Sequence, residues 1–242
     1  MHRYANPTRF LKIANPLLPW LAAGAAVCIG IALVQGLLLS PPDYQQGDTV
    51  RIMYVHVPSA WMALFAYAGM AVASAAALVW RHPLAALAAR AGAPIGAAFT
   101  LICLVTGSLW GKPMWGTWWV WDARLTSVLI LFFLYLGYMA LLNAFDDPGR
   151  GERSAAVLAV VGAVNLPVIK FSVDWWNTLH QPASVMRLDA PAIHPSMLWP
   201  LLLMALGFTL FYAALLIVRM RSEIAAAKIR NLLAMQAGGA GD

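Results

Sequence analysis

Three histidines in this sequence lie at the ends of apolar runs, where an imidazole could reach a ligand outside the helices. They are His56, His180 and His194. Imidazole nitrogen is a common transition-metal ligand, although a histidine at a membrane interface is more often simply hydrogen-bonded. Two neutral imidazoles on opposite faces of a planar iron macrocycle would fill both axial positions. We therefore predict His56 and His180 as axial ligands, and interpret His194 as a helix-start or interface residue.

Between two of these histidines lies a stretch of unusual composition, WGKPMWGTWWVWDARLT, at residues 110–126. Its five indoles are Trp110, Trp115, Trp118, Trp119 and Trp121. Indole faces offer apolar area and offset stacking against a conjugated ring. Glycine and proline within the stretch favour a turning excursion, so we predict a shelf for a flat apolar ligand. Two alternatives remain: an aromatic interface belt, or a short interfacial helix with Trp115, Trp118 and Trp119 on one face.

Charged residues beside the tryptophans could hold the edge of such a ligand. Asp122 precedes an apolar run, and we expect it to cap the helix that follows. Arg124 lies near that helix start, where a cation opposes the dipole, so it should pair with Asp122 or a ligand carboxylate. Arg51, Lys112 and Arg187 are the other external cations. Arginine binds carboxylates bidentately, so Arg51 and Arg124 are candidates for the propionates of a heme.

These residues must be positioned by membrane-spanning helices. The chain of 242 residues is 62% hydrophobic and 11% charged, and its apolar runs are long enough to cross a bilayer. We predict an all-α, polytopic membrane protein with short connections and one domain over residues 1–242. The six predicted spans are Leu17–Ser40, Pro58–Trp80, Gly92–Leu109, Ala123–Phe145, Ser154–Phe171 and Ser196–Val218.

The distribution of lysine and arginine predicts the orientation of these spans. Six spans place both termini and the second and fourth connections on one side, which carries eleven of the basic residues against five on the other. The positive-inside rule then places both termini in the cytoplasm. The tryptophan stretch and the three histidines consequently share the external face. The basic residues are scattered over loop ends, so they do not indicate nucleic-acid binding.

The stretch at residues 110–126, with MYVHVPSAW at residues 53–61 and WWNTLHQ at residues 175–181, resembles the WWD-signature cytochrome c maturation heme exporter protein C (CcmC) family. The resemblance covers essentially the whole chain. It implies a bacterial inner-membrane protein that binds heme b on its periplasmic side. His56 and His180 would be the axial ligands, and Trp110 to Asp122 would contact the porphyrin and present its vinyl edge.

The same resemblance implies a set of partners. Heme would pass to the periplasmic heme chaperone CcmE, within a complex containing the small membrane protein CcmD and the ABC transporter subunits CcmA and CcmB. The sequence has no GxxxxGK[ST] motif, so ATP energy would come from a partner. We therefore expect a heme transfer or attachment factor rather than a hydrolase.

Two other functions remain open at this level. One is a bis-histidine b-type membrane cytochrome for electron transfer, although such proteins usually bury their histidine pairs within helices. The other is a transporter whose loops merely form an interface belt, for which Asn165 and Lys170 are the only weak intramembrane candidates.

Overall fold

In the computed structural model, the polypeptide forms a bundle of long helices, and six segments are long and apolar enough to cross a membrane. The structure describes residues 6–182, 184–185 and 190–239. The helices are α1 (Pro7–Leu33), α2 (Met53–Trp80), α3 (Pro83–Trp115), α4 (Ala123–Leu141), α5 (Pro148–Gly162), α6 (Asn165–Trp175) and α7 (Pro195–Gly239). The prediction of an all-α, multi-pass membrane protein is confirmed.

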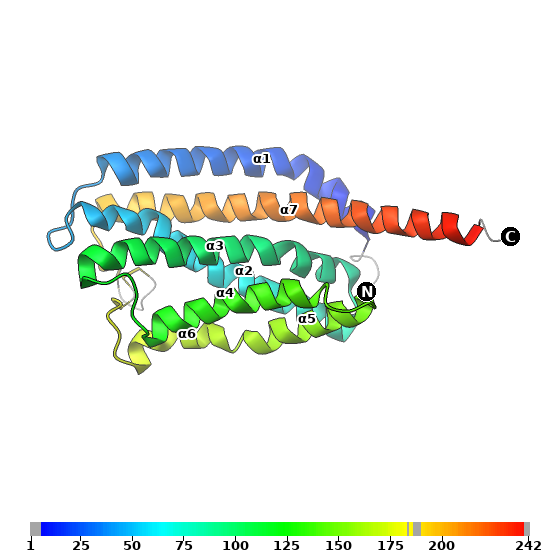
Figure 1. Cartoon of the computed structure of the whole chain (residues 1–242). Coiled ribbons are helices and arrows are strands. Elements are labelled where there is room, and N and C mark those ends of the chain that lie inside the picture. Colours follow the sequence, from blue (N-terminus) through cyan, green and yellow to red (C-terminus); the bar gives the residue numbers. More distant parts are fainter. Residues whose placement is uncertain (1–5, 183, 186–189, 240–242) are drawn as a thin grey trace.

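Helix packing separates the bundle into two connected parts (Figure 1). Helices α1 and α7 lie side by side along one edge, while α2 packs against α3 and α5, and α4 packs against α3, α5 and α6. Helices α2 and α3 both contact α7, so they join the two parts. The start of α1 and the end of α7 lie toward the same end of the bundle. The connections that carry the predicted site residues lie at the opposite end.

In the core of the bundle, buried tyrosines pack against glycines on neighbouring helices. Tyr67 and Tyr135 pack edge to face with ring centroids 5.0 Å apart, and the Tyr135 hydroxyl donates to the carbonyl of Ala63 at 2.8 Å. A Cβ at Gly96 would collide with the Tyr135 hydroxyl, and one at Gly162 with that of Tyr67. Small residues thus allow the helices to approach closely, as is typical where no water separates them.

The boundaries of several spans differ from the predictions. Helix α2 begins at Met53 rather than Pro58, because a 3₁₀ turn over Asp48–Ile52 leads directly into it. Helix α3 begins at Pro83, where the His82 side chain accepts from the Ala85 amide, so the predicted start at Gly92 is wrong.

Differences also occur at the helix ends. Helix α1 begins at Pro7 rather than Leu17 and continues as a π-helical segment over Val34–Leu39, which agrees with the predicted end at Ser40. Helix α4 ends at Leu141 rather than Phe145. Helix α7 runs on to Gly239, well beyond the predicted Val218. The polar segment after Met220 is therefore helical as well.

The fifth span, predicted as one helix over Ser154–Phe171, is divided into α5 and α6. Pro167 cannot donate to the carbonyl of Ala163, and its ring would clash there, so that carbonyl accepts from Leu166 at 3.0 Å instead. Asn165, at the start of α6, donates through Nδ2 to the carbonyl of Ser127 on α4 at 2.8 Å. The interruption is thus satisfied from within the protein, as a bilayer requires.

The close contact between α1 and α7 predicts a stability effect. A Cβ at Gly207 would lie 2.7 Å from Ile29 Cγ1 and 3.1 Å from the Ile29 backbone nitrogen. We expect Gly207→Leu to lower the apparent unfolding temperature of the detergent-purified chain, since overpacking costs about 1–3 kcal/mol. Gly30→Leu is the matched control, because nothing lies within 4 Å of a Cβ there. Equal unfolding temperatures for the two variants would contradict the packing of α1 on α7.

Candidate functional site

His56 lies inside α2 rather than before it, so its predicted position ahead of the helix start is wrong. The side chain is only 8% exposed. Its Nδ1 lies 3.1 Å from the carbonyl oxygen of Cys103 and 3.0 Å from Thr106 Oγ1, both on α3. A carbonyl only accepts, and the Thr106 hydroxyl donates to Ile102 O at 2.6 Å, so Nδ1 carries the proton. The Nε2 lone pair of His56 therefore remains available for a metal.

His180 lies in an irregular segment that follows the end of α6 at Trp175. Its backbone N–H donates to Thr178 Oγ1 at 3.0 Å, which fixes the local turn. Its Nδ1 lies 3.1 Å from the carbonyl oxygen of Gln181, which again places the proton on Nδ1. Partial burial lowers the pKa of His180, although the hydrogen bond to Gln181 opposes this. The lowered pKa favours the neutral imidazole, the form that binds metals.

The end of α3 brings the two histidines to the same end of the bundle. The ring of Trp110 lies 5.7 Å from that of His56 in an edge-to-face arrangement, measured between centroids. The ring of Trp115 lies 6.4 Å from that of His180. The sequence-based expectation that the histidines and tryptophans converge on one face is thus met, while metal ligation stays a prediction.

The tryptophan stretch divides into a helical and an irregular part. Trp110 and Trp115 belong to the last turns of α3, which ends at Gly116 in the left-handed conformation with φ 75°. Residues 116–122 are not helical, so the alternative of a short interfacial helix bearing Trp115, Trp118 and Trp119 is wrong. Gly111 and Pro113, expected to shape a loop, lie within α3 instead.

The irregular part contains two exposed indoles, those of Trp118 and Trp121, and one that packs against a neighbour, that of Trp119. Trp118 and Trp121 are 55% and 75% exposed. Trp119 packs edge to face on Trp121 with centroids 5.6 Å apart. Lys112 holds the turn by donating to the carbonyl of Gly116 at 3.0 Å, and its ammonium lies 5.8 Å from the Trp118 ring centroid. The segment therefore offers exposed aromatic faces beside a helix end that carries the half-buried Trp110 and Trp115.

Asp122 caps α4, as predicted. Its Oδ1 accepts from the Leu125 amide at 2.8 Å. Arg124 was expected to pair with Asp122 or with a ligand carboxylate, and the structure gives it other partners on α6. Its Nε donates to Ser172 Oγ at 2.6 Å, and its Nη2 to the carbonyl of Lys170 at 3.4 Å. Arg124 thus ties the start of α4 to α6, the helix that leads to His180.

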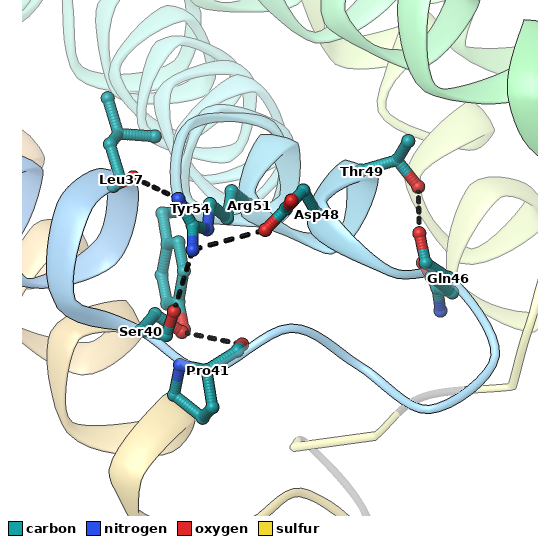
Figure 2. A network of polar contacts seen from close by, with 8 residues as sticks. All are labelled: Leu37, Ser40, Pro41, Gln46, Asp48, Thr49, Arg51 and Tyr54. Atoms are coloured by element: carbon teal, nitrogen blue, oxygen red, sulfur yellow. Dashed lines mark hydrogen bonds and ion pairs between the residues drawn. The ribbon is translucent and has the colours of Figure 1, made fainter.

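Arg51 holds the external connection between α1 and α2 (Figure 2). Its Nη1 donates to the carbonyl of Leu37 at 2.8 Å, and its Nη2 donates to the carbonyl of Ser40 at 3.1 Å and pairs with Asp48. The Ser40 hydroxyl also bonds that of buried Tyr54 on α2. These contacts fix the end of the π-helical segment against the start of α2, close to His56.

Gln46 is a site residue that the sequence analysis missed. Its Oε1 accepts from Trp110 Nε1 at 3.0 Å, and Trp110 is the indole that packs on His56. Nearby, Thr49 Oγ1 lies 3.8 Å from Met114 Sδ on α3. The short connection before α2 thus contacts the end of α3 at two points. Only a known contact with Trp110 could have singled out Gln46, because glutamine in a polar loop carries no signal of its own.

His194 has the local role that was predicted for it. It precedes α7, where its carbonyl accepts from the amides of Met197 and Leu198 at 2.9 Å. Its Nδ1 lies 2.8 Å from Ser196 Oγ. His194 therefore belongs to the helix start. Arg187, the remaining predicted external cation, lies outside the described residues.

Three of the predicted site residues each have a buried polar atom with no hydrogen-bond partner within the described part of the chain. They are Arg51 Nε, Trp119 Nε1 and Asp122 Oδ2. Buried polar groups in native proteins are nearly always paired, with protein, water or ligand. A ligand with an apolar face and polar edge groups would suit this set of donors and acceptors.

Comparison with known proteins gives one consistent result. A family model described as heme exporter protein C matches residues 1–235. Heme exporter protein C of Bradyrhizobium diazoefficiens is 60% identical over 96% of this chain and 88% of its own length. The proteins of that name from Haemophilus influenzae and Escherichia coli K12 are 52% and 50% identical, each over 93% of this chain, and 91% and 90% of their own lengths are covered.

Because Asp122 caps α4, two substitutions should distinguish the stability that its hydrogen bond contributes from the effect of its charge. Asp122→Ala removes the acceptor for the Leu125 amide and should destabilise the chain by about 1 kcal/mol. Asp122→Asn keeps a side-chain acceptor and should leave stability nearly unchanged. Thermal unfolding followed by circular dichroism measures both. A smaller loss for alanine than for asparagine would show that the cap does not stabilise α4.

Proposed function

This chain belongs to the heme exporter protein C family, and from that premise we propose that it binds heme b at the histidine and tryptophan site and delivers it to the heme chaperone CcmE. The observation that carries this proposal is the state of the two histidines. His56 and His180 each engage Nδ1 with a backbone carbonyl, which leaves Nε2 free, and both lie against the end of α3.

The hydrogen bonds to Nδ1 suit axial ligation. A metal-bound histidine usually donates its other ring N–H to a carbonyl or carboxylate, which fixes the ring orientation and raises the basicity of the ligand. Two neutral imidazoles are also the axial ligands found in many low-spin hemes. His56 is rigidly held between two helices, whereas His180 is held by its own irregular segment. This asymmetry favours His180 as the ligand that is released first.

The surrounding residues suit the rest of the heme cargo. Trp110, Trp115 and Trp119 would lie against the porphyrin, with the exposed Trp118 and Trp121 at its rim. Arg51 and Arg124 each use only part of their guanidinium donors within the protein, so each could also contact a propionate.

Asp122, beside these indoles, has one carboxylate oxygen that lacks a protein partner. Together these groups would leave one edge of the ring exposed toward the acceptor. The vinyl edge implied by family resemblance would then face CcmE.

Delivery in this proposal is a transfer between proteins and uses no catalytic residue of this chain. Release requires the bond between iron and one imidazole to weaken, through competition by the acceptor or movement caused by a partner. CcmD, CcmA and CcmB are the proposed partners, with ATP energy coming from the transporter subunits. The exposed indoles of Trp118 and Trp121 form a surface on which an acceptor could dock beside the cargo.

The proposed location is the bacterial inner membrane, with both termini in the cytoplasm and the heme site at the periplasmic face. Two observations support this orientation: the excess of basic residues on the termini side and the arrangement of the bundle, where the site and the termini lie at opposite ends. The alternative of an electron-transfer cytochrome is less favoured, because His180 lies outside the helices and the site opens to an exposed aromatic surface.

Axial ligation predicts a specific spectral response. His180→Gly should lower heme affinity at least tenfold, roughly the scale of losses at metal sites, and remove the low-spin bis-imidazole absorption spectrum. Added imidazole should restore that spectrum, because it can occupy the vacated position. His56→Gly should also lose the spectrum, with poorer rescue in its buried position. The measurement is heme titration of the purified chain by absorption spectroscopy.

The control for these variants is His194→Gly, which removes an imidazole at the same end of the bundle but outside the proposed ligand pair. It should keep the low-spin spectrum. Full heme content in both the His56 and the His180 variant would contradict the assignment of these histidines as axial ligands. Loss of CcmE loading without loss of heme would instead place these histidines in the transfer step only.

The close packing of His56 against Gly107 of α3 allows a second test of its role as a ligand. A Cβ at Gly107 would lie 2.9 Å from His56 Cε1, so Gly107→Ala must push the imidazole away. We expect heme affinity to fall by roughly tenfold, as for other disturbances of ligand orientation. Gly69→Ala is the control, since its Cβ would only reach ordinary contact at 4.0 Å from the Tyr212 hydroxyl. Unchanged heme titration in Gly107→Ala would contradict the role of the His56 orientation.

A further inference from the structure

A groove at the end of the bundle opposite the candidate site lies between α1 and α7. Its volume is about 600 Å³, within the range of ligand sites. Helix α7 lines it with residues that recur at helical spacing on one face, and α1 contributes two residues one turn apart. The lining residues are Leu11, Asn15, Val218, Arg221, Ser222, Ile224, Ala225 and Lys228.

The groove lies where the apolar part of both helices gives way to charge. On α1 no charged residue occurs from residue 13 to residue 42, and Lys12 is the last cation before that run. On α7 none occurs from residue 201 to residue 218, and Arg219 is the first cation after it. Leu11 to Asn15 and Val218 to Lys228 therefore straddle the expected boundary between hydrocarbon and headgroups.

The groove has a cationic rim and an apolar floor. Ile224 packs with Phe10 of α1 against a small buried cluster, which closes the floor. Arg221 and Lys228 are exposed, and neither has an ion pair within the described part of the chain. The nearest acid on α7, Glu223, is engaged elsewhere by Arg90 at 3.7 Å. Two cations without counter-ions therefore face a space in which no described lining residue is acidic.

We infer that this groove binds an anionic phospholipid of the adjacent leaflet, with its phosphate between Arg221 and Lys228 and an acyl chain along Leu11 and Val218. The two cations are seven residues apart on α7, about 10 Å along the helix, so one headgroup can reach both. The groove is remote from the histidines, so this inference does not depend on the heme proposal.

Native mass spectrometry of the purified chain with dioleoyl phosphatidylglycerol or dioleoyl phosphatidylcholine tests this site. The wild-type chain should bind the anionic lipid more tightly than the zwitterionic one. Arg221→Gln with Lys228→Gln should weaken phosphatidylglycerol binding by about fivefold for each cation removed. Arg153→Gln with Arg230→Gln is the matched control, because it removes the same charge from residues outside the groove, and it should bind phosphatidylglycerol like the wild type.

Each other outcome overturns the inference. Equal binding of the two lipids by the wild type would exclude a headgroup site. Equal losses in the groove and control variants would show only attraction to net charge. Glycerol phosphate serves as the soluble source of the same anion, and competition by it at the concentration of the lipid would assign the groove to a free phosphate compound. Circular dichroism of all variants checks that the helices are retained.

Discussion

The contact between α2 and α3 sets the geometry on which the candidate site depends. His56 is buried in this contact, and its Nδ1 is fixed by the Cys103 carbonyl and the Thr106 hydroxyl. Gly107 allows the ring to lie against α3, and Trp110 covers it one turn later. Because α3 continues to Trp115, which lies beside His180, one rigid helix provides a common reference for both imidazoles. Under the proposed function, α3 would form a fixed surface against which heme is bound.

The opposite wall of the site is built from less regular structure. The chain leaves α3 at Gly116, passes through the exposed indoles and enters α4 at the Asp122 cap. Arg124 then fastens α4 to α6, whose end leads to His180. Segments without helical hydrogen bonds open at lower free-energy cost than a helix core. The combination of a rigid ligand and a more loosely held one is therefore consistent with a protein that transfers its cargo rather than retaining it.

The two ends of the bundle differ in the chemistry that the bilayer permits. Between them, backbone groups must be satisfied internally, and the interruption at Ala163 shows how Asn165 and Leu166 achieve this. Polar and aromatic residues that could recognise a ligand collect at one end, where water and partner proteins have access. Arg221 and Lys228, which have no ion pair within the described residues, lie toward the other end, where α7 extends beyond the bundle. Membrane position would thus separate the proposed heme site from the proposed lipid site in one small chain.

The sequence by itself determined the helical class, the number of spans and the common face of the histidines and tryptophans, because hydropathy and span parity depend on composition along the chain. It also determined the Asp122 cap, which is a local signal. Only the tertiary structure decided that His56 lies inside α2, that residues 110–115 extend α3, and that Gln46 and Ser172 position Trp110 and Arg124. The hydrogen bonds of Gln46 with Trp110 and of Ser172 with Arg124 join residues more than forty positions apart, and no local pattern encodes which distant donor meets which acceptor.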